Sequence, residues 1–281
     1  MAQTNEQSDF SGNRSDDSGS RTSKLAGPGM LDSLTELPRT LFEVSMLTTQ
    51  WASLMREAPE AQPHPVMILP GFSAGDSSTV MLRRFLTQLG YKPLPWLQGV
   101  NTGHPRLLEA AMIRFYRLSH SMGTKISLVG QSLGGVYARE IAKQFPDAVR
   151  SVITLGSPYG ATETGSTNPL VEKLFERMSG LTVEELRAMM PSARESAPLA
   201  MPTTSVYSKA DGVVGWETCI EPESPTSENI RVWGSHSGMG MNPDVFRIVA
   251  DRLAQDPESW QPFKADRTCL KLIYPPTDKR A

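Results

Sequence analysis

The stretch "KISLVGQSLGGVYAREIAK", residues 125–143, decides the fold that we expect for this chain. The short apolar run "KISLVG" predicts a buried strand, and "LGGVYAREIAK" predicts a helix that follows after a sharp turn. Residues 130–134 (GQSLG) match G-x-S-x-G, the pattern of a serine exposed on a tight strand-to-helix turn. Gly134 and Gly135 leave clearance where such a strand and helix crowd together. Ser132 is therefore the first candidate nucleophile.

A second match to the same pattern lies in "LPGFSAGDSS", residues 69–78. The chain has 22 glycines, and chance produces such a match in roughly one sequence of this kind in six, so the pattern alone is weak. Ser73 also follows a predicted strand and precedes a helix. That strand is the first of the predicted sheet, however, and no Gly-Gly pair follows the serine. The context favours Ser132 over Ser73.

A serine hydroxyl becomes a good nucleophile when a base removes its proton and a third group orients that base. For a nucleophile on a turn of this kind, the acidic residue and then the histidine follow the serine along the chain. The four histidines are at positions 64, 104, 120 and 236. Of these, His236 alone follows Ser132, and it comes shortly after the predicted strand "NIRVWG". His236 is therefore the candidate base.

Two aspartates, Asp147 and Asp211, lie between Ser132 and His236. Asp147 sits in "FPDAV", a helix-to-strand turn, which would place it at the wrong end of the sheet. Asp211 follows the predicted strand "TTSVYSK" at its carboxyl end, where catalytic groups gather in open α/β sheets. Asp211 is the candidate that orients His236. The alternatives are structural roles: a helix-capping serine, a turn aspartate in "KADG" and a solvated loop histidine.

Strands and helices alternate along most of the chain, which favours a mostly parallel sheet covered by helices on both faces. The predicted strands are "HPVMILPGF", "KPLPWLQG", "KISLVG", "VRSVITLGSP", "TTSVYSK" and "NIRVWG". The predicted helices among them are "SSTVMLRRFLTQLGY", "HPRLLEAAMIRFYRLSHSMG", "LGGVYAREIAKQFP" and "PDVFRIVADRLAQ". We expect a single α/β domain over residues 61–264.

Residues 158–201 interrupt this alternation with two short predicted helices. One begins at Asn168-Pro169, and the other begins with Thr182 and Glu185 in the spacing of a capping box. Insertions of this length are usually lids or binding caps, and the alternative is a helical embellishment that thickens the domain. Apolar, Met-rich lid helices would suit an apolar substrate. The candidate substrate-binding residues are Phe72, Leu174, Phe175 and Met178.

The two ends of the chain differ from its centre. Residues 1–28 are polar and rich in Ser, Asp, Gly and Asn, so we expect a disordered tail. Residues 38–57 predict a helix with Pro38 in its first turn. We expect the segment 29–60 to dock on the core rather than on a membrane, because it lacks the Lys/Arg-rich face of membrane-surface helices. Residues 265–281 are expected to form a C-terminal tail.

The composition argues against several classes of function. A formal net charge of −2 over 281 residues gives no basic field for nucleic acid. No stretch approaches the roughly 18 apolar residues of a membrane span. The N-terminus lacks the cationic start and apolar core of a secretory signal, so we expect a cytoplasmic protein. Cys219 and Cys269 are too few for a disulfide framework, and two free thiols are favoured over one bridge.

Five segments carry a family resemblance that extends over residues 64–256. They are "ILPGF", "LVGQSLGG", "VITLGSP", "SKADGVV" and "GSHSGMGMNP", in this order. Together they resemble the bacterial triacylglycerol lipases and esterases of the α/β-hydrolase superfamily. The resemblance implies an α/β-hydrolase fold, with a mostly parallel central sheet flanked by helices and a helical lid insertion. It also implies that Ser132, Asp211 and His236 form a catalytic triad.

Hydrolases of this fold hold the oxyanion of the reaction with two backbone N–H groups. One comes from the residue after the nucleophile, and the other comes from a loop after an early strand. Leu133 occupies the first place, and "LPGFSAG" occupies the loop, with Phe72 as its donor. The first G-x-S-x-G match is thus predicted to be an oxyanion loop. The chain departs from the family at Pro70-Gly71, where many lipases have His-Gly, and at Gln131, where a His is frequent.

The sequence therefore predicts a serine hydrolase that cleaves carboxylic esters of small molecules or lipids through an acyl-enzyme. Nothing in the sequence indicates a metal or an organic cofactor, and the oligomeric state is not predicted. One alternative is an acyltransferase on the same fold, which would pass the acyl group to an alcohol or a thiol. The other is a non-catalytic binding protein that has kept the fold, although the intact Ser/Asp/His set argues against it. Peripheral contact with lipid stays open.

Overall fold

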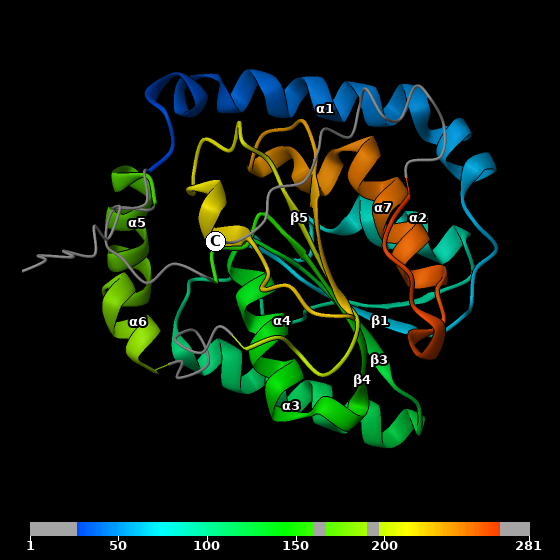
Figure 1. Cartoon of the computed structure of the whole chain (residues 1–281). Helices are drawn as coiled ribbons and strands as arrows, with labels where there is room; N and C mark the ends of the chain where they lie inside the picture. Colours follow the sequence, from blue (N-terminus) through cyan, green and yellow to red (C-terminus); the bar gives the residue numbers. More distant parts are fainter. Residues whose placement is uncertain (1–26, 160–166, 190–196, 265–281) are drawn as a thin grey trace, which may run out of the picture.

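The computed structural model describes residues 27–159, 167–189 and 197–264. Its centre is a six-stranded sheet in which all neighbouring strands are parallel, in the order β2-β1-β3-β4-β5-β6 (Figure 1). The strands are β1 (Pro65–Leu69), β2 (Lys92–Leu94), β3 (Ile126–Gln131), β4 (Val149–Leu155), β5 (Thr203–Tyr207) and β6 (Ser227–Arg231). The predicted parallel sheet is confirmed.

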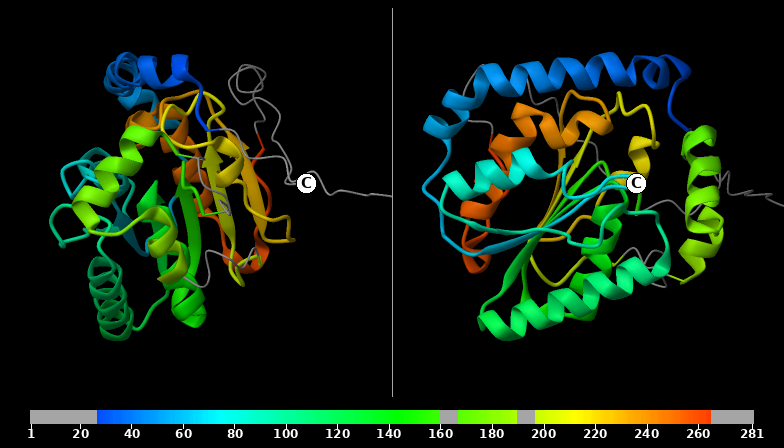
Figure 2. Two further views of the ribbon diagram at one scale, coloured as in Figure 1. Left: turned by 90° about the vertical axis from the view of Figure 1, so that its left-hand side faces the viewer. Right: turned by 180° about the vertical axis from the view of Figure 1, so that it is seen from behind.

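Helices cover both faces of this sheet (Figures 1 and 2). One layer holds α1 (Met30–Glu57), α2 (Val80–Gln88) and α7 (Pro243–Ala254), and the other holds α3 (Pro105–Met122) and α4 (Leu133–Gln144). β1 serves both layers because successive side chains of a strand point to opposite faces. Val66 and Ile68 pack in the cluster under α1, α2 and α7, whereas Met67 and Leu69 pack against α3 and α4. Burial on both faces explains the continuous apolar run of this strand.

The strand order reverses between β1 and β3. From β1 the chain first adds β2 at the edge of the sheet, then crosses back and places β3 on the other side of β1. β1 and β3 are neighbours in the sheet, and the loops that follow them lead away in opposite directions. In open α/β sheets, such a switch point at the carboxyl ends of the strands is where ligands bind.

The N-terminal helix is longer than the sequence indicates. α1 begins at Met30 rather than at Pro38, so Pro38 lies inside the helix instead of in its first turn. Proline usually disfavours a helix interior because it has no N–H to donate. Here, side chains on both sides of Pro38 bond to loops of the core, including Ser33 to Gly212 and Thr40 to Ser235. These tertiary contacts outweigh the local preference for a start at proline.

The interruption before β5 contains two helices, α5 (Pro169–Ser179) and α6 (Val183–Met189), which stand to one side of the layers (Figure 1). Asn168 caps α5 by accepting a hydrogen bond from the Leu170 N–H at 2.9 Å. Thr182 and Glu185 form the reciprocal capping box that their spacing predicts, at 2.7 and 3.1 Å. Both helix starts are therefore fixed by local sequence.

Some expectations lie outside the described residues. These are the disorder of the N-terminal tail over residues 1–26, the C-terminal tail, the parts of the insertion at 160–166 and 190–196, and Cys269. Within the described part of the chain, no helix combines the length and apolar character that a membrane crossing requires.

Candidate active site

Ser132 lies on the turn between β3 and α4, at the switch point of the sheet. Its backbone has φ 51° and ψ −125°, a positive-φ conformation that residues with a side chain seldom adopt. The turn is held by the Ser132 N–H, which donates to the Leu155 carbonyl of β4 at 2.8 Å. Gly134 permits it, because a Cβ there would collide with the Leu69 carbonyl of β1. The sheet thus supports a strained serine at the top of its carboxyl edge.

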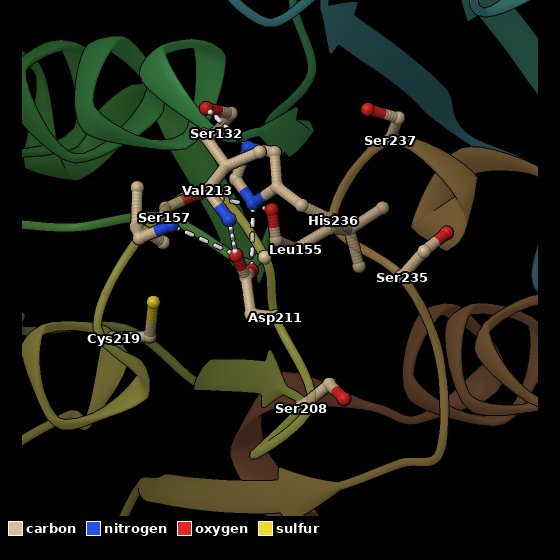
Figure 3. Close-up of polar contacts among 12 residues, drawn as sticks. Ser132, Leu155, Ser157, Ser208, Asp211, Val213, Cys219, Ser235, His236 and Ser237 are labelled. Carbon is tan, nitrogen blue, oxygen red and sulfur yellow. Dashed lines mark hydrogen bonds and ion pairs between the residues drawn. The ribbon is translucent and has the colours of Figure 1, made fainter. Parts of the chain in front are cut away.

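His236 and Asp211 approach Ser132 from the loops that follow β6 and β5 (Figure 3). The His236 Nε2 atom lies 2.9 Å from the Ser132 Oγ, and its Nδ1 atom lies 2.6 Å from Asp211 Oδ2. The structure therefore brings together the three residues that the sequence singles out, in one hydrogen-bonded series. Asp147 lies in a short 3-10 turn (Pro146–Ala148) just before β4, at the opposite end of the sheet.

Asp211 is oriented by its own loop. Its Oδ1 atom accepts hydrogen bonds from the Val213 and Val214 N–H groups, at 2.9 and 2.8 Å. The other oxygen, Oδ2, is the one that faces His236. Asp211 is buried, so its charge is compensated by these donors and by the imidazole rather than by water.

The surroundings of His236 favour its protonated form. Burial by itself lowers the pKa of the imidazole, but the charge and hydrogen bond of Asp211, together with the charge of Glu36 on α1, outweigh burial and raise it. The ring therefore holds an added proton more readily than its burial alone would allow. With Asp211 on Nδ1, the neutral ring presents Nε2 as an acceptor to the serine hydroxyl.

Gln131, immediately before Ser132, holds the segment that carries His236. Its Nε2 donates to the carbonyl of His236 at 3.1 Å and to that of Ser237 at 3.4 Å. A histidine is frequent at this position in the family that the sequence resembles. The sequence shows this departure from the family, but the role follows only from the contact with a loop about a hundred residues away.

The loop after β1 passes directly beside the serine. A Cβ on Gly71 would lie 3.2 Å from the Ser132 Cβ, so glycine permits the approach. Asn101, which is fully buried, holds the loop: its side-chain N–H donates to the Pro70 carbonyl at 3.0 Å, and its own carbonyl accepts from the Ser73 N–H at 2.8 Å. No sequence signal indicated Asn101. Ser73 is exposed on this loop.

A cavity opens beside Ser132, enclosing about 750 Å³ of space that is partly open to solvent. Phe72 and Leu133, the predicted oxyanion residues, both line it, and the ring of Phe72 packs 5.3 Å from that of Phe175 on α5. The other apolar lining residues include Val136, Val171, Val183, Leu186, Val213 and Val214. The cavity is therefore mainly apolar, with the serine hydroxyl at its edge.

Two of the candidate substrate-binding residues do not line this cavity. Phe175 does, but Leu174 is exposed to solvent and Met178 lies outside the lining. The helical period explains the position of Leu174: Val171 and Phe175 are four residues apart and both face the cavity, whereas Leu174 is turned by about 100° from Phe175. Met178 lies near the angular position of Val171 but two turns further along α5, beyond the lining. Val171 and, on α6, Leu186 line the cavity where these two residues do not, and the substrate contacts of all four stay predictions.

Cys219 lies near Asp211 (Figure 3) but has the properties of a core residue. It is buried, and burial raises the pKa of its thiol well above the usual range, with the charge of Asp211 acting in the same direction. A protonated, inaccessible thiol is a poor nucleophile. Because Cys269 is not among the described residues, the pairing of the two cysteines stays a prediction. No group of three or more potential metal ligands occurs in the ranges that the structure describes.

The sequence matches no protein-family model and no curated protein. The structure is similar to Aspergillus fumigatus lipase B, with 17% identity and a TM-score of 0.54 over 72% of this chain and 57% of the lipase. It is also similar to a monoacylglycerol lipase of Paleococcus ferrophilus, with 16% identity and a TM-score of 0.52 over 68% of this chain and 93% of that one. A third similar structure is a proposed non-heme bromoperoxidase of Mycobacterium tuberculosis, at 13% identity and a TM-score of 0.51, over 69% and 92% of the two chains.

These likenesses agree with the topology of the sheet. The chain spans little more than half the length of the fungal lipase. At identities this low, similarity of structure shows a shared fold and leaves the activity open, because one fold hosts many activities. The chain has the α/β-hydrolase fold, as its resemblance to that superfamily predicts.

Proposed function

We propose that the protein is a serine hydrolase that cleaves carboxylic esters through an acyl-enzyme. The observation that carries the proposal is the hydrogen-bonded series Ser132–His236–Asp211 at the edge of an apolar cavity. Each member is held by groups that leave its reactive atom facing the next, which is the arrangement that nucleophilic catalysis by serine requires. The lipases among the similar structures are consistent with this chemistry.

In the proposed mechanism, the Ser132 Oγ attacks the ester carbonyl carbon while His236 Nε2 takes the hydroxyl proton. Asp211 orients the ring and stabilises the imidazolium that forms. The Phe72 and Leu133 N–H groups stabilise the oxyanion. The tetrahedral intermediate then expels the alkoxide, which takes the proton from His236 and leaves as the alcohol. Water, deprotonated by the same ring, hydrolyses the acyl-enzyme and regenerates Ser132.

The substrate proposed is an ester with an apolar acyl chain, of a small molecule or a lipid. The mainly aliphatic and aromatic lining of the cavity supports this choice, because apolar surface of the substrate would be removed from water there. We propose that α5 and α6, which contribute Val171, Phe175, Val183 and Leu186 to the lining, act as a lid over the acyl chain.

The test compares two serines that both occupy G-x-S-x-G patterns. Ser132→Ala should reduce hydrolysis of a p-nitrophenyl ester by a factor on the order of 10⁴ or more and should abolish labelling by a fluorophosphonate probe. Ser73→Ala is the matched control and should retain most of the activity, because the expected contribution of its loop is the Phe72 N–H. A Ser132→Ala protein that kept its activity, or a folded parent protein that the probe failed to label, would refute the proposal.

A further inference from the structure

The inward side of α1 contacts the two loops that carry the acid and the base. We call residues 208–213 the Asp211 loop and residues 234–237 the His236 loop. Several side chains of α1 bond to them. Ser33 donates to the Gly212 carbonyl at 2.8 Å, Arg39 donates to the Ala210 and Gly234 carbonyls, and Thr40 Oγ1 lies 3.0 Å from Ser235 Oγ. Both loops therefore rest on one helix from a distant part of the chain.

Glu36, on the same side of α1, contacts both loops with a single carboxylate. Its Oε1 atom accepts from the Ser237 N–H at 2.7 Å, and its Oε2 atom accepts from the Gly212 N–H at 3.2 Å. Ser237 follows His236 directly and Gly212 follows Asp211 directly. The carboxylate thus spans the two residues adjacent to the acid–base pair. Arg39, 3.2 Å from Oε2, keeps the glutamate oriented.

We propose that Glu36 is a positioning residue that holds the Asp211 loop and the His236 loop in register with each other, and so keeps His236 aligned between Asp211 and Ser132. The inference rests on the proposed function for its effect on turnover. The hydrogen bonds from backbone N–H groups to an ionised, largely buried carboxylate are of the stronger kind, and they add to the bonds that Ser33, Arg39 and Thr40 make to the same loops. Glu36 does not line the cavity beside Ser132. Its effect on the reaction is therefore exerted through His236.

Glu36 also adds negative charge near the imidazole. The charges that act on His236 are those of Asp211, from the loop after β5, and of Glu36, from α1. Arg39 and Glu43 of α1 bond to the neighbouring residues Gly234 and Ser235. Glu43 bonds to Ser235, and burial raises the pKa of its carboxyl. Glu36 favours the protonated ring together with Asp211. Loss of the Glu36 charge should therefore lower the pKa of His236.

The experiment uses three variants of the full chain. Glu36→Gln keeps the size but removes the charge and one acceptor, so one of the two N–H groups faces an NH₂ donor. Glu36→Asp keeps the charge but shortens the side chain, so that it cannot reach both loops. Glu57→Gln, at the exposed end of the same helix, is the matched control.

Turnover of a p-nitrophenyl ester gives the first readout. We expect kcat to fall about 10- to 100-fold in both Glu36 variants with KM nearly unchanged. The acid limb of the pH–kcat/KM profile should move to lower pH in Glu36→Gln and much less in Glu36→Asp. The control should match the parent in every parameter. A merely structural role would lower the amount of folded enzyme without moving the pH profile.

Two NMR readouts test the same inference without turnover. The imidazole of His236 should titrate at lower pH in Glu36→Gln than in the parent, and the Gly212 and Ser237 amides should exchange with solvent faster. If the parent does not hydrolyse esters, the proposed function fails, while these two readouts still decide the role of Glu36. An unchanged titration together with unchanged amide exchange in Glu36→Gln would overturn the inference.

A separate observation concerns the outer side of α1. Its charged residues between Met30 and Thr49 point inward or lie partly buried, and none of the exposed residues of that stretch is charged. Six large apolar side chains there have exposed fractions of 62–80%, and Val44 adds a seventh at 40%. The six are Met30, Leu31, Leu34, Leu37, Leu41 and Phe42. We call these side chains the outer apolar face of α1, a helix that runs along one edge of the molecule (Figure 1).

We infer that the outer apolar face of α1 pairs with the same face of a second copy of this chain. Met30, Leu34, Leu37, Leu41 and Val44 alternate at spacings of four and three residues, the period with which paired helices interlock. At about 100 Å² of exposed surface per side chain, pairing would bury on the order of 1,400 Å² in total, within the range of stable interfaces. A membrane fits less well, because such helices carry Lys and Arg beside the apolar face, and here Arg39 points inward.

The test measures the mass of the full chain in solution by sedimentation. We expect a dimer for the parent at micromolar concentration, a monomer for the double variant Leu34→Glu, Leu41→Glu, and a dimer for the control Ile113→Glu, which changes an exposed apolar residue of α3. Circular dichroism checks that each variant is folded. A parent that is monomeric at all concentrations would overturn the inference. It would also be overturned if the parent bound neutral phosphatidylcholine vesicles, the double variant did not, and neither protein formed a dimer.

Discussion

At the scale of single residues, the protonation of His236 decides when the proposed hydrolase can act. The ring must be neutral to take the proton of Ser132, and the charges of Asp211 and Glu36 make it hold its own proton more firmly than a free imidazole does. A histidine with a raised pKa is a stronger base when neutral, but it is neutral over a smaller range of pH. The raised pKa therefore makes His236 a stronger base, but it also confines the activity of the proposed hydrolase to higher pH.

We expect kcat/KM of the parent protein to fall with decreasing pH, with a midpoint above about 6.5, the ordinary pKa of histidine. Of the two carboxylates, Asp211 has the larger effect on the pKa of His236. Asp211→Asn should therefore move the midpoint to lower pH, while kcat drops by a factor on the order of 10⁴. Initial rates on a p-nitrophenyl ester between pH 5 and pH 9, at constant ionic strength, measure both effects. An acid limb centred below pH 6 in the parent would contradict the raised pKa.

The three central residues could be found from the sequence because each carries local information. Ser132 lies in a short motif between a strand and a helix, and chain order then leaves His236 as the base. The residues that hold them carry no such signal. Glu36, Asn101 and Gln131 act through contacts with segments far away in the chain, and an isolated Glu, Asn or Gln is usually an ordinary surface or turn residue.

At the scale of elements, α5 shows how helical geometry selects the residues of the cavity. The sequence predicts the helix and its cap correctly, because Asn168-Pro169 is a local signal. It does not reveal which face turns inward, since apolar residues occur on more than one side. Leu174 and Phe175 are neighbours in the chain, yet one is exposed and the other is buried against Phe72.

Phe175 and Leu174 give a matched test of the proposal that the cavity beside Ser132 holds the acyl chain of the substrate. Phe175→Ala removes a ring from the cavity wall, so longer acyl chains should be accepted, and the ratio of kcat/KM for an octanoate to a butyrate ester should rise roughly tenfold. Leu174→Ala, on the outer face of the same helix, should leave the ratio unchanged. Equal effects of the two variants, measured with p-nitrophenyl esters, would show that the cavity does not hold the acyl chain.

The start of α1 shows the opposite case, in which a local signal misleads. Pro38 is well suited to a first helical turn, but the helix begins at Met30 because residues before the proline bond to the core loops. Tertiary contacts of this kind are invisible in a single sequence. The inner strands β1, β3 and β4, by contrast, are predicted well, since a buried parallel strand needs an apolar run whichever neighbours it has. The edge strands β2 and β6 lack such a run, and their bounds are predicted less closely.

At the scale of the whole molecule, a buried ion pair joins the two halves of the sheet. Arg139 of α4 bonds to Glu221, which lies between β5 and β6, and both side chains are almost completely buried. The guanidinium also stacks on the ring of Tyr159, 4.1 Å away, which lines the cavity. A charged pair in such a place ties α4, the segment after β4 and the segment after β5 together.

Removing one partner of a buried pair leaves the other charge without compensation, which is more costly than the loss of the attraction itself. Glu221→Gln should therefore lower the free energy of unfolding by about 3–5 kcal/mol, whereas Glu109→Gln, at an exposed position of α3, should change it by less than about 0.5 kcal/mol. Urea unfolding followed by tryptophan fluorescence measures both. The double variant Arg139→Met, Glu221→Leu, which removes both charges, should regain much of the loss. A single Glu221→Gln variant as stable as its control would show that the buried pair contributes little to stability, and that the strand pairing and the apolar packing hold these segments together without it.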